Sequence, residues 1–225
     1  MTPFSKSLAA VSLALGAALA SPAAAQVNGR VATVDTSGAI IGTEALKTAY
    51  EQVNTTYQAQ IDTAQAKRQE LSNVLQPFDT NNNGNLDESE LPAVQASTQL
   101  ATIQRLEGEI NGLTEQVADA RIFAVEQILA QYAAALEEVA DQQQIQMILP
   151  VGSVQFARRE ADITQAITTA LNTKVPSVSV VPPQGYRRSQ QGTAIFQDIQ
   201  QRLIAARLRA AQEAQQGNPQ APAGR

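Results

Sequence analysis

Residues 103–117 read IQRLEGEINGLTEQV, and this stretch decides the fold. Its apolar residues follow one another at steps of three and four, the spacing of a coiled-coil seam on one helix face. The seam consists of Ile103, Leu106, Ile110, Leu113 and Val117. It continues with drift through Ala120, Ala124, Ile128, Tyr132, Leu136 and Val139, which predicts one helix over residues 92–142. At 1.5 Å per residue that helix is about 75 Å long, more than a compact domain needs.

A second long helix is predicted over residues 44–76. Its apolar and small residues recur at steps of three, four or seven, at Leu46, Tyr50, Val53, Tyr57, Ile61, Ala64, Leu71 and Leu75. Pro77 ends this helix, and Pro92 lies in the first turn of the next one, where a missing amide donor is tolerated. Residues 44–142 therefore predict a long antiparallel helical hairpin that projects from a body.

The connection between the two helices, residues 79–90, reads DTNNNGNLDESE and resembles the calcium loop of an EF-hand. Oxygen-bearing side chains occupy the ligand positions, and Gly84 lies where such a loop must turn sharply. The predicted metal ligands are Asp79, Asn81, Asn83, Asn85 (through its carbonyl), Asp87 and Glu90. We therefore expect one calcium ion per chain at the hairpin tip. The other interpretation is a polar, Asn-rich turn.

The sequence has no cysteine and no histidine. It therefore lacks disulfides, thiolate metal sites and a thiol nucleophile, together with the usual general base and zinc ligand. No phosphate-binding loop is recognisable, so no nucleotide is expected. The carboxylate pairs Glu88/Glu90 and Glu137/Glu138 lie in the metal loop or on a helix, where we interpret them as ligands or solvated charges. The sequence predicts that the protein is not an enzyme.

Residues 1–25 are typical of a secretory signal peptide. Lys6 supplies the positive start, residues 8–20 are apolar, and Ala25 ends a run of small residues. The apolar run is too short to span a bilayer, so we expect export, cleavage near Ala25 and Gln26, and no stable membrane insertion. Residues 26–185 are acidic, which argues against nonspecific binding of nucleic acid, whereas residues 186–225 are basic.

The segments on either side of the hairpin predict a small α/β body made of residues 26–43 and 143–183. Strands are expected at 29–36 and 145–149, further short strands at 154–157 and 178–181, and a turn at 37–43. A helix is expected over 162–172, with Asp162 and Gln165 as a capping box. Residues 184–225 predict a C-terminal amphipathic helix (193–212) and a disordered tail. The fold class is mainly α with a small β body.

This order of elements resembles the Skp-like (OmpH-family) periplasmic chaperones. The resemblance covers residues 29–172 and is carried by RVATVD at 30–35, QIQMILPVGSVQF at 144–156 and the Asp-Ile-Thr turn at 162–164. It implies a homotrimer that shares strands in a trimerisation body, with the hairpins as tentacles around a cavity. The acidic body, the calcium-type loop and the segment after residue 174 depart from the family pattern.

The function implied by this resemblance is an ATP-independent periplasmic holdase for unfolded outer-membrane proteins. Binding of such clients is then expected to be diffuse along the apolar stripe, at Tyr50, Tyr57, Ile110 and Leu113. The alternative is a calcium-binding, coiled-coil structural protein of the cell envelope.

Overall fold

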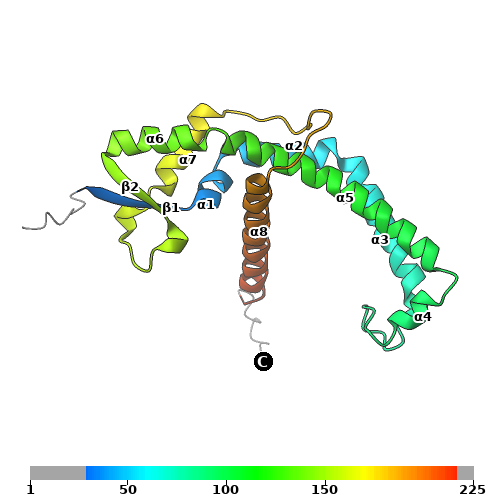
Figure 1. Cartoon of the computed structure of the whole chain (residues 1–225). Coiled ribbons are helices and arrows are strands. Elements are labelled where there is room, and N and C mark those ends of the chain that lie inside the picture. The colour runs from blue at the N-terminus through cyan, green and yellow to red at the C-terminus, as the bar shows by residue number, and fades with distance from the viewer. Residues whose placement is uncertain (1–28, 217–225) are drawn as a thin grey trace, which may run out of the picture.

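The computed structural model describes residues 29–216, so the predicted signal peptide and most of the predicted tail lie outside the described residues. The chain is mainly helical with one small sheet, as predicted (Figure 1). Its elements, in chain order, are β1 (Arg30–Val34), α1 (Thr36–Ile41), α2 (Glu44–Thr56), α3 (Gln58–Leu75), α4 (Leu91–Gln95), α5 (Leu100–Leu129), α6 (Tyr132–Gln143), β2 (Ile145–Pro150), α7 (Thr164–Lys174) and α8 (Gln190–Gln216).

The hairpin consists of α2 and α3 packed against α5, and it projects from the body as a curved arm with α4 near its tip (Figure 1). Each arm was predicted as one continuous helix, and this was wrong. The first arm is interrupted at Tyr57, and the second at residues 96–99 and 130–131. At the former break the Ser97 hydroxyl donates to the Val94 carbonyl, a local bond that competes with the helical pattern. The latter break lets α6 turn onto α7 in the body.

The sheet pairs β1 with β2 in parallel, with Val31 opposite Met147 and Val34 opposite Pro150. On the other side of β1, the Ile163 N–H donates to the Thr33 carbonyl (2.9 Å). The further strands predicted at 154–157 and 178–181 are absent from the described structure. In residues 178–181, the Val180 carbonyl and the Ser179 N–H are bonded to side chains of the hairpin rather than to another strand.

Two local predictions in the body need correction. Residues 36–41 form the short helix α1 rather than a turn, because the Asp35 carboxylate accepts the Gly38 N–H (3.0 Å) and caps the helix. The prediction of a capping box at α7 is also wrong. Asp162 accepts the N–H (2.9 Å) and the hydroxyl (2.6 Å) of Thr164, so the cap closes within two residues and does not use Gln165.

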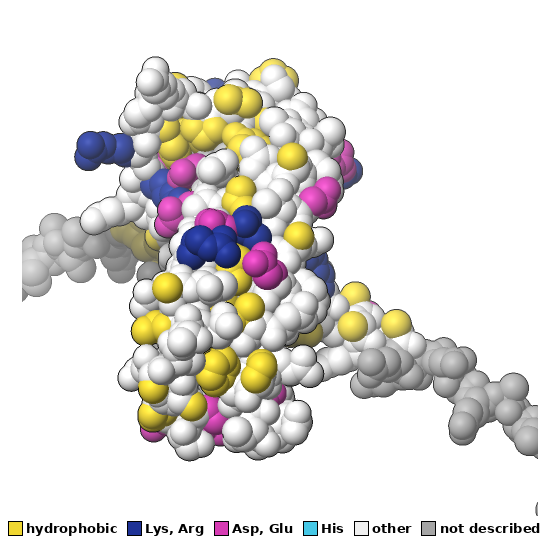
Figure 2. All heavy atoms as spheres, turned by 90° about the vertical axis from the view of Figure 1, so that its right-hand side faces the viewer, with side chains coloured by type: hydrophobic (Ala, Val, Ile, Leu, Met, Phe, Trp, Pro, Cys, Tyr) yellow, Lys and Arg dark blue, Asp and Glu magenta, His cyan; other side chains and the backbone are white. Residues whose placement is uncertain are grey.

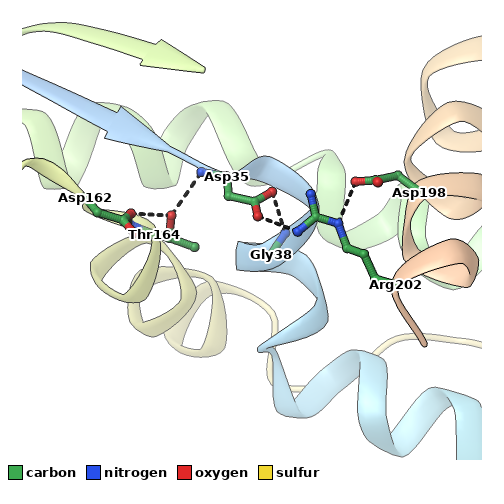
Figure 3. A network of polar contacts seen from close by, with 6 residues as sticks. All are labelled: Asp35, Gly38, Asp162, Thr164, Asp198 and Arg202. Atoms are coloured by element: carbon green, nitrogen blue, oxygen red, sulfur yellow. Dashed lines mark hydrogen bonds and ion pairs between the residues drawn. The ribbon is translucent and has the colours of Figure 1, made fainter. Parts of the chain in front are cut away.

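Helix α8 belongs to the same packed structure as the body, although we predicted residues 184–225 as a separate segment. It stands out steeply from the hairpin base (Figure 1), and its first half packs on α1 and α5. Arg202 of α8 bridges Asp198 and the Asp35 carboxylate that caps α1 (Figure 3). The main core joins all these elements; its largest fully buried side chains are Ile40, Ile128, Ile167, Leu171 and Ile199.

We expect the docking of α8 to depend on Ile199, which is 0% exposed, and not on Ile204, which is 55% exposed on the same helix. Ile199→Ala leaves a core cavity and should lower the free energy of unfolding by about 2–5 kcal/mol. Ile204→Ala is the matched control and should change it by less than about 0.5 kcal/mol. Urea denaturation of both variants checks the pair, and equal losses would contradict the packing of α8.

Candidate functional site

The loop at the hairpin tip is held by its own polar side chains. The two oxygens of the Asp79 carboxylate accept the N–H groups of Asn83 (3.1 Å) and Gly84 (2.8 Å). Asn82 and Gly84 have positive φ angles of 55° and 80°, a conformation that asparagine and glycine adopt most readily. The Asn-rich sequence therefore supplies both the turn and its hydrogen bonds.

Glu90 closes the loop from the other end. This side chain is only 4% exposed, and its Oε1 accepts the N–H and the hydroxyl of Thr80 (2.7 Å each). Its Oε2 accepts the N–H of Asp87 (3.1 Å). These hydrogen bonds, chiefly that from the Thr80 hydroxyl, lower the pKa of Glu90. The pKa of Asp87 is lowered in the same way, mainly by the Ser89 hydroxyl.

The predicted calcium ligands thus lie in one closed loop, and their hard oxygen donors suit calcium. Within residues 29–216, however, no three Asp, Glu, His or Cys side chains are grouped as a metal site. Asn81 instead donates from its amide nitrogen to Asp87 (2.9 Å), and the Asn83 amide oxygen accepts the Asn85 N–H (2.7 Å). The residues fit calcium by chemistry and by loop conformation. Binding requires several of these oxygens to exchange internal hydrogen bonds for the ion.

The apolar stripe predicted to meet clients is used largely by the chain itself. Ile110 is only 8% exposed, and Leu113 is half-buried beside a cavity along the hairpin. The Tyr57 hydroxyl donates to the Val180 carbonyl (3.2 Å), and the Tyr50 hydroxyl accepts from Gln200 (3.3 Å). Burial raises the pKa of both tyrosines. Sequence patterns did not reveal these contacts, because the partners lie more than a hundred residues along the chain.

The sequence patterns did not predict a network of contacts between α5 and residues 178–192, a segment we call the strap. Glu126 accepts hydrogen bonds from the Tyr186 hydroxyl (2.7 Å) and from the N–H of Ser189 (2.7 Å). The Tyr186 ring packs edge-on against Phe123, with ring centroids 5.2 Å apart. Burial and the Glu126 carboxylate raise the pKa of Tyr186. The strap therefore fastens the chain after α7 along the base of the hairpin.

Viewed toward the free end of the hairpin, the surface mixes hydrophobic, basic and acidic side chains without one large patch of a single kind (Figure 2). Large exposed apolar side chains lie at the tip (Leu91), in the strap (Val181), on α8 (Ile204 and Leu208) and on the body (Val31, Met147, Val151 and Phe156). Val31 and Met147 are partners in the parallel sheet, so they form a continuous exposed apolar strip beside the edge strand β2. Such a strip next to an open strand edge is a surface suited to pairing with another chain.

The matching family model is described as Outer membrane protein (OmpH-like) and matches residues 30–171. Among solved structures, the chain is similar to a protein from Caulobacter crescentus CB15 described as an OmpH-like outer membrane chaperone. The two share 15% identity over 72% of this chain and 91% of that chain, with a TM-score of 0.41. No curated protein matches this chain. Within the described part of the chain, none of the helices is long and apolar enough to cross a membrane.

The lowered pKa of Glu90 predicts that the tip loop loosens in acid. A carboxylate whose pKa is lowered by folding stabilises the loop above its unfolded pKa of about 4.3, and this contribution is lost as the pH falls through the folded value. The protection of the Thr80 and Asp87 amide protons, measured by NMR as the observed exchange rate relative to the intrinsic rate at each pH, should therefore fall below about pH 4. In Glu90→Gln this pH-dependent loss of protection should disappear; an identical pH profile in both proteins would contradict this role of Glu90.

Proposed function

The chain belongs to the OmpH-like family of outer membrane proteins, and from this membership we propose that it is a periplasmic chaperone that holds unfolded outer-membrane proteins without ATP. The observation that carries the proposal is the extent of the match. Residues 30–171 run from β1 through both arms of the hairpin to α7, so the body and the whole hairpin fall within the family. The protein is not an enzyme, in keeping with this family.

The proposed mechanism uses dispersed, weak contacts on the hairpin. Apolar and charged side chains are scattered among uncharged polar groups on the face seen toward its free end (Figure 2). An unfolded chain presents no fixed shape, so a surface of this kind holds many sequences without one pocket that dominates affinity. Each contact contributes little, and affinity comes from engaging several at once.

We infer that the working form is a homotrimer joined through the body. A two-stranded sheet is a marginal unit by itself, and an additional strand at the β2 edge would complete it. The apolar strip of Val31 and Met147 beside this edge supports that inference. Strand sharing would also remove an exposed edge that otherwise favours aggregation.

The alternative, a structural coiled-coil protein of the envelope, has one specific observation in its favour. Ile110 is buried inside the hairpin, as a rod-forming seam requires, and is not freely exposed to a client. A structural rod would not prevent the aggregation of an unfolded barrel protein, so an aggregation assay separates the two functions.

We expect the mature protein to be a trimer by light scattering and to suppress aggregation of a urea-denatured outer-membrane protein without ATP. Met147→Lys places a charge on the apolar strip and should give a monomer with at least a tenfold loss of suppression. Gln146→Lys, at the neighbouring exposed position of β2, is the control and should keep the trimer. A wild-type monomer would exclude the trimer, and a trimer that leaves aggregation unchanged would favour the structural rod.

We further propose that one calcium ion orders the hairpin tip. Asp79, Asp87 and Glu90 are the charged members of the ligand set, so we expect a dissociation constant of about 10⁻⁴–10⁻³ M. Calorimetry should show this binding in the wild type and in Glu88→Gln, whose altered side chain lies in the loop outside the ligand set. Glu90→Gln should abolish it while the trimer stays intact. An absence of heat at millimolar calcium would exclude the site.

A further inference from the structure

A cavity of about 480 Å³ lies between α2, α5 and the outer part of α8. Its apolar wall includes Leu46, Ile199 and Leu203, and Tyr50 contributes a ring. Three cationic side chains also line it, namely Lys47 of α2, Arg121 of α5 and Arg207 of α8. The apolar wall and the two guanidinium groups make this an unusual cavity for an acidic protein.

The charge of Arg121 is not balanced within the described chain. Among residues 29–216, no carboxylate forms an ion pair with Arg121 or Arg207, and Glu51, which also lines the cavity, pairs with neither. The Nε atom of Arg121 is buried and has no acceptor there. Its Nη2 donates to Asn54 (3.1 Å), and its guanidinium lies 5.6 Å from the Tyr50 ring centroid. Burial of an unpaired cation is unfavourable, so an anion bound beside Arg121 would be stabilised.

The cavity continues along the hairpin. A second cavity of about 440 Å³ is also lined by Asn54, Arg121 and Gln200, and it extends past Leu113 to Arg68. The two cavities adjoin at Arg121, and we call the pair the Arg121 groove. Two adjoining cavities along one hairpin suit an extended chain better than a compact anion.

Helix α5 already binds the backbone of the strap through the side chain of Gln127. The Gln127 amide donates to the Ser179 carbonyl (2.9 Å) and accepts the Ser179 N–H (3.0 Å), which is the bonding that one peptide group offers another. Asn54 and Gln200 place amides in the Arg121 groove, where the Asn54 oxygen already accepts from Arg121 and the Gln200 nitrogen already donates to Tyr50. A peptide entering the groove can therefore bond to the Asn54 amide nitrogen and the Gln200 amide oxygen.

We propose that the Arg121 groove binds an extended client segment in which a carboxylate lies next to an apolar side chain. The carboxylate pairs with Arg121 and Arg207, and the apolar side chain packs on the wall formed by Leu46, Tyr50 and Ile199. This inference rests on the proposed chaperone function and assigns it a preferred client chemistry. Diffuse contacts along the hairpin would retain other segments, while this groove would select acidic–apolar ones.

The test uses two fluorescein-labelled synthetic peptides that differ only in a central Leu-Asp or Leu-Asn pair. Fluorescence anisotropy with the full mature protein should show about tenfold tighter binding of the Leu-Asp peptide, an effect of about 1.4 kcal/mol. The double variant Arg121→Gln/Arg207→Gln should bring this ratio to about one. The control Arg105→Gln/Arg209→Gln removes the same charge from α5 and α8 at residues that do not line the groove, and should retain the ratio.

Replacement of the half-buried Arg121 could itself disturb folding, so a second variant tests the proposal with Arg121 unchanged. Arg207 is exposed, and Arg207→Glu should weaken the Leu-Asp peptide and favour a Leu-Lys peptide while the thermal melting curve stays unchanged. Equal binding of the Leu-Asp and Leu-Asn peptides by the wild type would overturn the proposal. Discrimination that survives Arg121→Gln/Arg207→Gln would also overturn it, because the selective site would then lie elsewhere.

Two parallel measurements separate this inference from the chaperone function. If the wild type suppresses aggregation of a denatured outer-membrane protein but shows no peptide preference, only the groove is overturned. If it neither suppresses aggregation nor binds either peptide, the chaperone function fails with it. Oleate binding that is lost in Arg121→Gln/Arg207→Gln, without a Leu-Asp preference in the wild type, would assign the groove to a lipid anion and overturn the client segment.

Discussion

The parallel pairing of β1 with β2 is the constraint on which the rest of the structure depends. Parallel strands cannot be joined by a tight turn and need a crossover connection. Here the connection is the whole hairpin, so the chain leaves the body along α2 and α3 and returns along α5 and α6 (Figure 1). The first arm therefore begins near the sheet, and the second arm ends there. The length of the hairpin sets how far the tip lies from the body and does not change the pairing of the strands.

The chain after α7 adds a second constraint at the hairpin base. The strap lies along α5 through Gln127 and Glu126, and α8 returns to the body, where Arg202 meets the Asp35 carboxylate (Figure 3). Asp35 also caps α1, and its N–H donates to the Thr164 hydroxyl (2.9 Å). One residue, Asp35, thus joins α1, the start of α7 and α8 through its carboxylate and its N–H. These contacts restrict the base of the hairpin, while the tip loop is held by hydrogen bonds among its own residues.

The division between base and tip bears on the proposed chaperone role. At the base the apolar side chains pack inside the chain itself. The hydroxyl of Tyr50 is bonded to Gln200 of α8, and that of Tyr57 is bonded to Val180 of the strap. Toward the tip the two arms contact each other, and ion pairs such as that between Lys67 and Glu109 reinforce the contact. Such partly exposed pairs add little stability. The outer hairpin, where α3 packs mainly on α5, is held by fewer elements than the base.

The sequence by itself determined the hairpin, both strands of the sheet, the α7 segment and the closed tip loop. Each follows from local spacing, because helical periodicity, strand alternation and the hydrogen bonds of the Asn-rich loop are fixed by neighbours within a few residues. Only the tertiary structure decided the breaks in the arms, the strap at residues 178–192 and the position of α8. The contacts of the Tyr50 and Tyr57 hydroxyls and the unpaired charge of Arg121 were likewise decided there. Apart from the break at residues 96–99, where Ser97 bonds locally to Val94, these features depend on partners far away in the chain, and no local pattern encodes which distant side chain will cover a given face.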